Sequence, residues 1–467
     1  MTTQWTAAEI AAATDGTTTG NWTATSVGID TRSLEKGALF VALPGARVDG
    51  HAHVKAALEA GAVAALVSKM IDGVDAAQLV LVENVEKALQ ALGAAARQRS
   101  HAQFIGVTGS VGKTGSKEML AAALAPLGRT YATKGNLNNH LGVPLTLANM
   151  PKNTQFAIIE MGMNHAGETA PLSHMANPDV ALITTVEAVH LEHFGSVEKI
   201  ADEKAEIFAG MGGAGVAVLN MDNAHFERLK ARAEYYELDR VLSFGSSKNA
   251  VCCMTDYRIE EMHSVVEAII AGTSISYRLG TVGKHWAVAS VAVLGVVDAL
   301  GCDLAKAAEA LAHFSEPKGR GKIEQLSVKG GLLTLVDDSY NASPVSVVGA
   351  ISKIAELKRA AKEPVRTVVV LGDMLELGET AEELHVGLMP AIINNQMDLV
   401  FAAGTFMQKM YDALPETMKG AYRPTSRELA PVVVEQLRPH DLVLIKGSRG
   451  SRMDIVVDAI KESADAV

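Results

Sequence analysis

The sequence predicts an α/β protein of three domains built on mostly parallel sheets. Its 467 residues exceed an ordinary domain of roughly 100 to 200 residues, which suggests about three of them. Hydrophobic residues make up 48% of the chain and charged residues 20%, so large cores can form. Short apolar runs alternate with amphipathic stretches along the chain, which is typical of parallel sheets covered by helices.

Residues 1–100 are expected to form a small N-terminal α/β domain. Its predicted strands are 39–43, 62–67 and 79–82. The stretch 85–99 places Leu89, Leu92 and Ala96 on one side at helical spacing. This stretch is therefore predicted to be an amphipathic helix.

Residues 101–315 are expected to form the central domain. A strand predicted at 104–108 leads into a Gly-rich loop and a helix whose apolar stripe stops at Gly128. Further buried strands are predicted at 156–161, 180–185 and 216–220. The region 242–279 is richer in strands.

Residues 316–467 are expected to form a third domain. The segment 315–321, which is rich in Gly and Lys/Arg, is interpreted as a linker. The strands predicted beyond it are 332–336, 367–371, 399–403 and 442–445. Because helical stretches separate these strands, a Rossmann-like domain is predicted.

Composition excludes several classes of partner. The net charge of -11 argues against nucleic acid as a partner, because nucleic acid would repel such a surface.

The N-terminus lacks a basic patch followed by an apolar run, so we expect a cytoplasmic protein. The longest apolar stretch, 286–297, is shorter than the about 18 residues of a spanning helix, so no membrane insertion is expected. Three cysteines without metal or disulfide spacing indicate inert thiols.

The strongest motif is a Gly-rich loop between the strand at 104–108 and the following helix. The residues predicted to cradle nucleotide phosphates are Thr108, Gly109, Ser110, Val111, Gly112, Lys113 and Thr114. Lys113 would neutralise the β/γ charge, and the Thr114 hydroxyl would ligate Mg²⁺. A site for ATP or GTP is therefore predicted.

A carboxylate and a lysine occupy unusual places for charged groups. Glu160 ends a buried apolar run, which suggests a second Mg²⁺ ligand, although a solvated strand end would also explain it. Lys204 lies on the apolar stripe of the helix predicted at 196–210, where it could snorkel. A desolvated, neutral lysine could instead add CO2 and become a carbamate. His190 or His193, in the preceding loop, could ligate a metal or be merely exposed.

Several long segments, in order along nearly the whole chain, resemble motifs of the Mur ligases. They are 108–114, 135–146, 160–168, 190–195 with 204–207, 318–321, 337–344, 371–378 and 446–449. The resemblance implies an N-terminal domain for a UDP-sugar, a central ATPase domain, and a C-terminal domain that closes over the site with the incoming amine.

The resemblance also implies roles for particular residues. Thr114 and Glu160 would hold one Mg²⁺, His190 a second, and Lys204 would be carbamylated. The further residues that it places at the ATP are Asn138, His285, Arg320 and Asp337. The residues that it places at the UDP group are Thr31, Arg32, Ser33, Asp49, Gly50 and His51.

Two positions depart from the family pattern. His285 is followed by Trp286, where the family usually has Asn, so the tryptophan could stack on the adenine instead. Ser343 stands where the family often has a second Asn, a small polar exchange that keeps the turn plausible.

Within the family, the segments 135–146 and 371–378 favour members that join D-alanyl-D-alanine to UDP-N-acetylmuramoyl-tripeptide through an acyl phosphate. Another amino-acid ligase of the superfamily, adding one residue to the muramyl peptide or glutamate to folate, is the nearest alternative. A non-ligating nucleotide switch is a further alternative, although the guanine-specific motif Asn-Lys-x-Asp is missing from the sequence.

Diaminopimelate and lysine stay open as the third residue of the acceptor peptide. A monomer is expected because no heptad repeat occurs.

Overall fold

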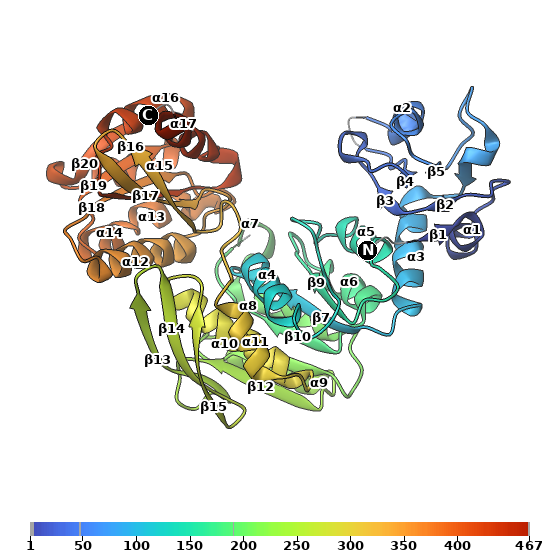
Figure 1. The fold of residues 1–467 in the computed structure, drawn as a ribbon, viewed down its shortest axis with the longest axis horizontal. Coiled ribbons are helices and arrows are strands. Elements are labelled where there is room, and N and C mark those ends of the chain that lie inside the picture. Colours follow the sequence, from blue (N-terminus) through green and yellow to red (C-terminus); the bar gives the residue numbers. More distant parts are fainter. Residues whose placement is uncertain (1–3, 46–47, 190, 466–467) are drawn as a thin grey trace.

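The computed structural model describes residues 4–45, 48–189 and 191–465. Three main sheets of four, nine and six strands follow one another along the chain, each with its own helices (Figure 1), and a two-stranded sheet lies near the N-terminus. The predicted α/β fold with mostly parallel sheets is confirmed. Among the described residues, no helix combines the length and apolarity needed to cross a bilayer.

The N-terminal sheet is small and parallel. Its strands, in spatial order, are β3 (Ser26–Gly28), β4 (Ala38–Val41), β5 (Ala64–Val67) and β6 (Leu79–Leu81). Its helices are α1 (Ala7–Thr14), α2 (Val54–Glu59) and α3 (Val85–Gln98), and a short ladder joins β1 (Trp5–Thr6) to β2 (Thr23–Ala24). Asn84 caps α3, whose buried face includes Leu89, Leu92 and Ala96 as the helical spacing predicts.

The N-terminal sheet is firmly attached to the central part. The Trp5 indole donates a hydrogen bond of 2.8 Å to the Ala148 carbonyl. The Asn149 amide pairs with both backbone groups of Val27, at 2.9 Å each. Apolar side chains from both parts form one continuous core. These two parts therefore make a single packed unit.

The central sheet carries the phosphate-binding loop. Its strands, in spatial order, are β15 (Thr273–Leu279), β14 (His263–Ile270), β13 (Cys252–Glu260), β12 (Arg240–Gly245), β11 (Val216–Asn220), β10 (Val180–Ile183), β7 (Gln103–Thr108), β9 (Phe156–Glu160) and β8 (Thr130–Ala132). The sheet is parallel from β8 to β13, and the β14 and β15 strands are antiparallel, which accounts for the strand-rich region.

Helices cover both faces of the central sheet. On one face lie α4 (Lys113–Leu124), α10 (Lys284–Ala299) and α11 (Leu304–Leu311). On the other lie α5 (Gly142–Ala148), α6 (Thr169–Ala176), α8 (Val197–Ala205) and α9 (Phe226–Tyr235), with the short α7 (Leu191–Phe194) before α8. Alternate side chains of β9, such as Ile158 and Ile159, enter opposite cores, as a strand buried on both faces requires.

The C-terminal sheet is parallel except at one edge. Its strands, in spatial order, are β16 (Lys322–Val328), β17 (Gly331–Asp338), β21 (Asp441–Lys446), β18 (Arg366–Gly372), β19 (Leu399–Ala403) and β20 (Lys419–Arg423), with only β16 antiparallel. Its helices are α12 (Pro344–Ala360), α13 (Ala381–Val386), α14 (Met389–Asn394), α15 (Thr405–Asp412), α16 (Ser426–Gln436) and α17 (Asp454–Asp465).

A buried ion pair ties the C-terminal part to the connection before β16. Lys353 of α12 lies 2.7 Å from Glu316, and their side chains are 2% and 5% exposed. Lys353 also donates to the Gly321 carbonyl at 2.8 Å, and Glu316 accepts a hydrogen bond from the Thr281 hydroxyl. Helix α12 is therefore anchored at the junction between the central and C-terminal parts.

Candidate active site

A cleft of about 1180 Å³ lies between the central and C-terminal parts. Residues from both parts line it, the first along the chain being Ser110 and the last Gly450. The carboxyl ends of parallel strands and the turns that follow them supply most of its floor, which is where open α/β sheets bind ligands. None of the described residues of the N-terminal sheet lines it.

The phosphate-binding loop forms the central floor of the cleft. Gly109 and Gly112 have φ angles of +148° and +88°, which a residue with a side chain rarely adopts. A Cβ added at Gly109 would meet the Thr184 hydroxyl at 1.9 Å, so this close approach also needs glycine. Helix α4 starts at Lys113, so its free N–H groups face the loop.

Lys113 folds back onto its own loop. Its ammonium donates to the Gly109 carbonyl at 2.5 Å and lies 3.5 Å from that of Ser110. Desolvation lowers the pKa of Lys113, and Glu160 opposes that shift. The ammonium therefore lies at the rim of the space in which the loop would hold phosphates.

Glu160 sits at the end of β9, facing the start of α4. Its Oε1 accepts hydrogen bonds from the Asn138 amide at 2.8 Å and from the Thr114 hydroxyl at 3.2 Å. Its Oε2 is buried and has no hydrogen-bond partner among the described residues. A buried carboxylate oxygen without a partner is costly, and a divalent cation would satisfy it. The donor set, a carboxylate beside a hydroxyl, fits Mg²⁺.

Lys204 of α8 is 2% exposed, as its place on the apolar stripe predicts. Burial lowers the pKa of Lys204 well below its ordinary value, and the positive charge of Lys113 lowers it further. The neighbouring Glu203 is engaged elsewhere, accepting from the backbone N–H groups of Gly167 and Thr169. His190 lies outside the described residues.

His193 is exposed, and its ring lies 4.6 Å from that of His165.

His285 and Trp286 lie in the first turn of α10, at the side of the cleft. Desolvation lowers the pKa of His285, and the positive charges of Lys353 and Lys446 lower it further. The Trp286 ring is only 7% exposed and packs against Phe314, at 5.5 Å between centroids. It also touches α4, because a Cβ added at Gly115 would lie 2.5 Å from it. Most of the ring is thus already covered.

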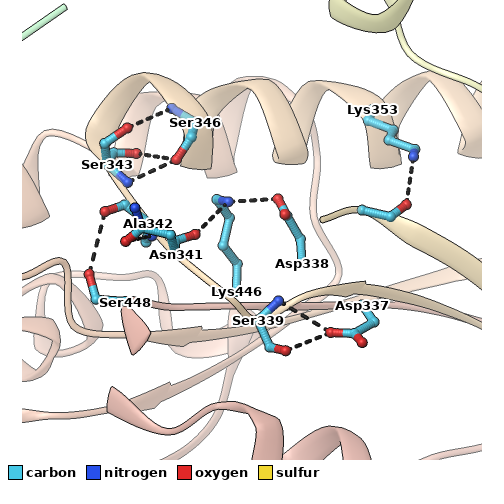
Figure 2. A network of polar contacts seen from close by, with 11 residues as sticks. Asp337, Asp338, Ser339, Asn341, Ala342, Ser343, Ser346, Lys353, Lys446 and Ser448 are labelled. Atoms are coloured by element: carbon cyan, nitrogen blue, oxygen red, sulfur yellow. Dashed lines mark hydrogen bonds and ion pairs between the residues drawn. The ribbon is translucent and has the colours of Figure 1, made fainter. Parts of the chain in front are cut away.

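The C-terminal wall of the cleft is cationic. Arg320 lies over the Tyr340 ring at 4.1 Å, and Arg449 lies 5.7 Å from the same ring. Lys446 pairs with Asp338 at 2.6 Å and donates to the Asn341 carbonyl at 3.0 Å (Figure 2).

Asp337 and Asp338 have different surroundings. Asp337 is 1% exposed and accepts hydrogen bonds from Ser339 (Figure 2). It also accepts one from the backbone N–H of Gly319, so it shapes the loop that carries Arg320. Asp338 faces the cleft, and burial raises its pKa, an effect that Lys446 opposes. Asp338 and Lys446 lie in the family-like segments 337–344 and 446–449, but sequence reasoning gave neither of them a role. It missed Lys353, whose only signal was a charge within an otherwise apolar helical stretch.

The predicted UDP residues lie on the N-terminal part, apart from the cleft. Asp49 caps the turn Gly50–His53 and lies 2.6 Å from Nδ1 of His51, whose Nε2 accepts from the Ser68 backbone at 2.9 Å. Asp30 caps the turn Thr31–Ser33 and pairs with the exposed Arg32 at 2.5 Å. His51 thus organises two loops, while the Arg32 side chain is exposed to solvent with its charge paired to Asp30.

Family models match three successive stretches of the chain. The Mur ligase family catalytic domain matches residues 23–79, the Mur ligase middle domain residues 107–297, and the Mur ligase glutamate ligase domain residues 321–449. The chain belongs to the Mur ligase family and is therefore an ATP-dependent amide-bond ligase.

Particular relatives carry a narrower name. The chain is 34% identical to a UDP-N-acetylmuramoyl-tripeptide–D-alanyl-D-alanine ligase of Rickettsia prowazekii, over 92% of this chain and 94% of that protein. It is 34% identical to the enzyme of the same name from Escherichia coli, over 94% of each.

Solved structures give the same picture. MurF from Acinetobacter baumannii superposes with a TM-score of 0.85 at 28% identity, covering 99% of both chains. MurF ligase from Thermotoga maritima in complex with ADP superposes with a TM-score of 0.75 at 26% identity, covering 94% of this chain and 98% of that one.

Proposed function

We propose that this enzyme joins D-alanyl-D-alanine to UDP-N-acetylmuramoyl-tripeptide, with conversion of ATP to ADP and phosphate, to form the UDP-muramyl-pentapeptide used for peptidoglycan. Relatives with this activity in their names match over nearly the full length. The observation that carries the chemistry is the unpartnered Oε2 of Glu160 beside Thr114 at the phosphate-binding loop, opposite the cationic C-terminal wall.

In the first step, an oxygen of the tripeptide carboxylate attacks the γ-phosphorus of ATP. The new P–O bond replaces the bond to the bridging oxygen, and ADP leaves. The N–H groups at the start of α4 would hold the phosphates, while Lys113 swings from the Gly109 carbonyl to the transferred group. The protein contributes position and positive charge to this step rather than a nucleophile.

In the second step, the free amine of the dipeptide attacks the acyl carbon. The C–O bond to phosphate breaks, the amine loses a proton, and an amide remains. Water would hydrolyse the acyl phosphate if it reached the carbon first. Arg320 and Tyr340, on the C-terminal wall, would screen the reacting group once that wall approaches the central floor.

Thr114 and Glu160 would hold one Mg²⁺, and His190 a second. When bound, the metal ions would neutralise charge on the phosphates. Asn138 would orient the Glu160 carboxylate through its 2.8 Å hydrogen bond. His285 and Arg320 would contact the nucleotide from the sides of the cleft, and Asp337 would act through the loop that carries Arg320.

Lys204 would react as a neutral amine with CO2, releasing a proton and leaving an anionic carbamate. Its deep burial and the nearby positive charge of Lys113 favour the neutral form. The Lys204→Ala variant should lose most ligation, and small carboxylic acids should restore part of it. Failure of acetate to restore any activity to a folded variant would count against the carbamate.

The three domains would comprise residues 1–100, 101–315 and 316–467. The first would bind the UDP group, the second ATP and the third the dipeptide. Thr31, Arg32, Ser33, Asp49, Gly50 and His51 would form the UDP side. The enzyme would act as a monomer in the cytoplasm, where its nucleotide substrates are made.

The decisive experiment measures phosphate release from ATP with UDP-N-acetylmuramoyl-tripeptide, with and without D-alanyl-D-alanine, and identifies the product by mass spectrometry. Release that needs both substrates and yields the pentapeptide supports the proposal. Turnover with a single amino acid, or with folate and glutamate, would assign the chain to another ligase. Parallel reactions with diaminopimelate and lysine tripeptides would define the third residue.

A further inference from the structure

Lys117 is a fully buried lysine that the proposed reaction does not use. It lies on α4, one turn after Lys113 and Thr114, and its side chain is 0% exposed. Its ammonium donates to the Thr133 carbonyl at 2.6 Å and lies 2.6 Å from Glu118. A buried ammonium is costly, so this position implies a specific role for the contacts that it makes.

Thr133 connects that ammonium to the candidate metal ligand. It follows the last residue of β8 and is 1% exposed. Its hydroxyl accepts a hydrogen bond of 3.0 Å from the backbone N–H of Glu160. Because β8 and β9 are parallel neighbours, their carboxyl ends meet there. Any displacement of Thr133 would therefore move the backbone that carries Glu160.

These contacts close a ring. Thr114 and Lys117 are three residues apart, so they lie on the same side of α4. The Thr114 hydroxyl donates a hydrogen bond to the Glu160 carboxylate. The Lys117 ammonium donates one to the carbonyl of Thr133, the residue that holds the Glu160 backbone. The ring fixes both the backbone and the side chain of Glu160 relative to the start of α4.

We propose that Lys117 and Thr133 are positioning residues that hold Glu160 in the orientation required for divalent-cation binding. The proposal rests on the metal site of the proposed function. Loss of contacts that orient a ligand usually lowers metal affinity by about 10-fold to 100-fold. Neither the Lys117 nor the Thr133 side chain lines the cleft. A substitution of either residue should therefore lower cation affinity indirectly, through the orientation of Glu160.

The test is binding of Mn²⁺ in the presence of ADP, measured from the electron paramagnetic resonance signal of the free ion. The Thr133→Val variant keeps the shape but removes the hydroxyl, whereas Thr133→Ser keeps the hydroxyl and is the matched control. Thr133→Val and Lys117→Met should each bind Mn²⁺ about 10-fold more weakly than the unaltered protein. Thr133→Ser should retain affinity close to that of the unaltered protein. Thermal unfolding of each variant verifies that it is folded.

Glu160→Gln separates this inference from the proposed function. If Glu160→Gln weakens Mn²⁺ binding while Thr133→Val and Lys117→Met do not, the positioning role is wrong and the metal site stands. If Glu160→Gln binds Mn²⁺ as tightly as the unaltered protein, the metal site itself is wrong. Equal losses in Thr133→Val and Thr133→Ser would also overturn the positioning role, because the hydroxyl would then be irrelevant.

Discussion

Asn138 donates a hydrogen bond of 2.8 Å to Oε1 of Glu160, which leaves the buried Oε2 as the oxygen without a partner. The two side chains come from a loop and a strand end that lie 22 residues apart. Their contact fixes which carboxylate oxygen is left without a partner, so the amide should matter for catalysis.

Replacing Asn138 with Ala should lower kcat/KM for ATP by about 10-fold, because a group that orients a metal ligand is lost. Steady-state kinetics at several Mg²⁺ concentrations would show the loss as a higher Mg²⁺ requirement. The exposed Asn249, replaced in the same way, is the control. An Asn138→Ala enzyme with unchanged Mg²⁺ dependence would contradict the prediction.

Replacing Lys113 with Met should reduce ATP turnover by about 100-fold or more, since the cation that stabilises the transferred phosphoryl group is removed. Phosphate release under saturating substrates measures the change. Lys248→Met, at an exposed turn, should keep its activity. Comparable losses in both variants would show that the assay reports folding rather than phosphoryl transfer.

Lys204 should make stability depend on pH. Its folded pKa is lowered while the unfolded pKa stays near 10.5, so between these values the unfolded chain binds more protons. The free energy of unfolding should therefore rise with pH in that window. In CO2-free buffer, Lys204→Met should unfold at a higher temperature than the unaltered protein at pH 7, and the difference should narrow toward pH 10. A difference that stays constant with pH would show that the ammonium is not destabilised by folding.

The buried pair of Glu316 and Lys353 should show the cost of an isolated charge. Lys353→Met leaves Glu316 without its cation and should destabilise the protein by about 3–5 kcal/mol. The double variant Glu316→Gln with Lys353→Met should recover much of that loss, because no buried charge remains.

Lys358 lies on α12 like Lys353, and it forms a partly exposed pair with Asp398, the residue before β19. Lys358→Met, which breaks this pair, should cost at most about 1 kcal/mol. Chemical denaturation of the three variants gives the comparison. A double variant as unstable as Lys353→Met alone would show that the loss arises from packing rather than charge.

Much of the fold could be predicted from the sequence, because its signals are local. The β7 strand, the Gly-rich loop and α4 follow from an apolar run, glycines and a helical stripe within about twenty residues. The place of Lys204 on an apolar stripe predicted its burial, and the end of an apolar run indicated Glu160. The order and type of the main strands were likewise predictable, with differences of a few residues at their ends.

The partners of these side chains could not be predicted, because they depend on contacts between distant segments. The sequence indicated a carboxylate at Glu160, but only the packing of β8 beside β9 brings Thr133 and Lys117 behind it. Asp337 and Asp338 are adjacent and chemically identical, yet the alternation of side chains along β17 turns one inward and the other toward the cleft. Trp286 looked free to stack on a base, whereas the approach of α10 to Gly115 of α4 covers most of its ring. The sequence by itself determined the family, the nucleotide loop and the chemical types of the site residues. Tertiary structure alone decided which of their atoms face the cleft, because that depends on how separate elements pack.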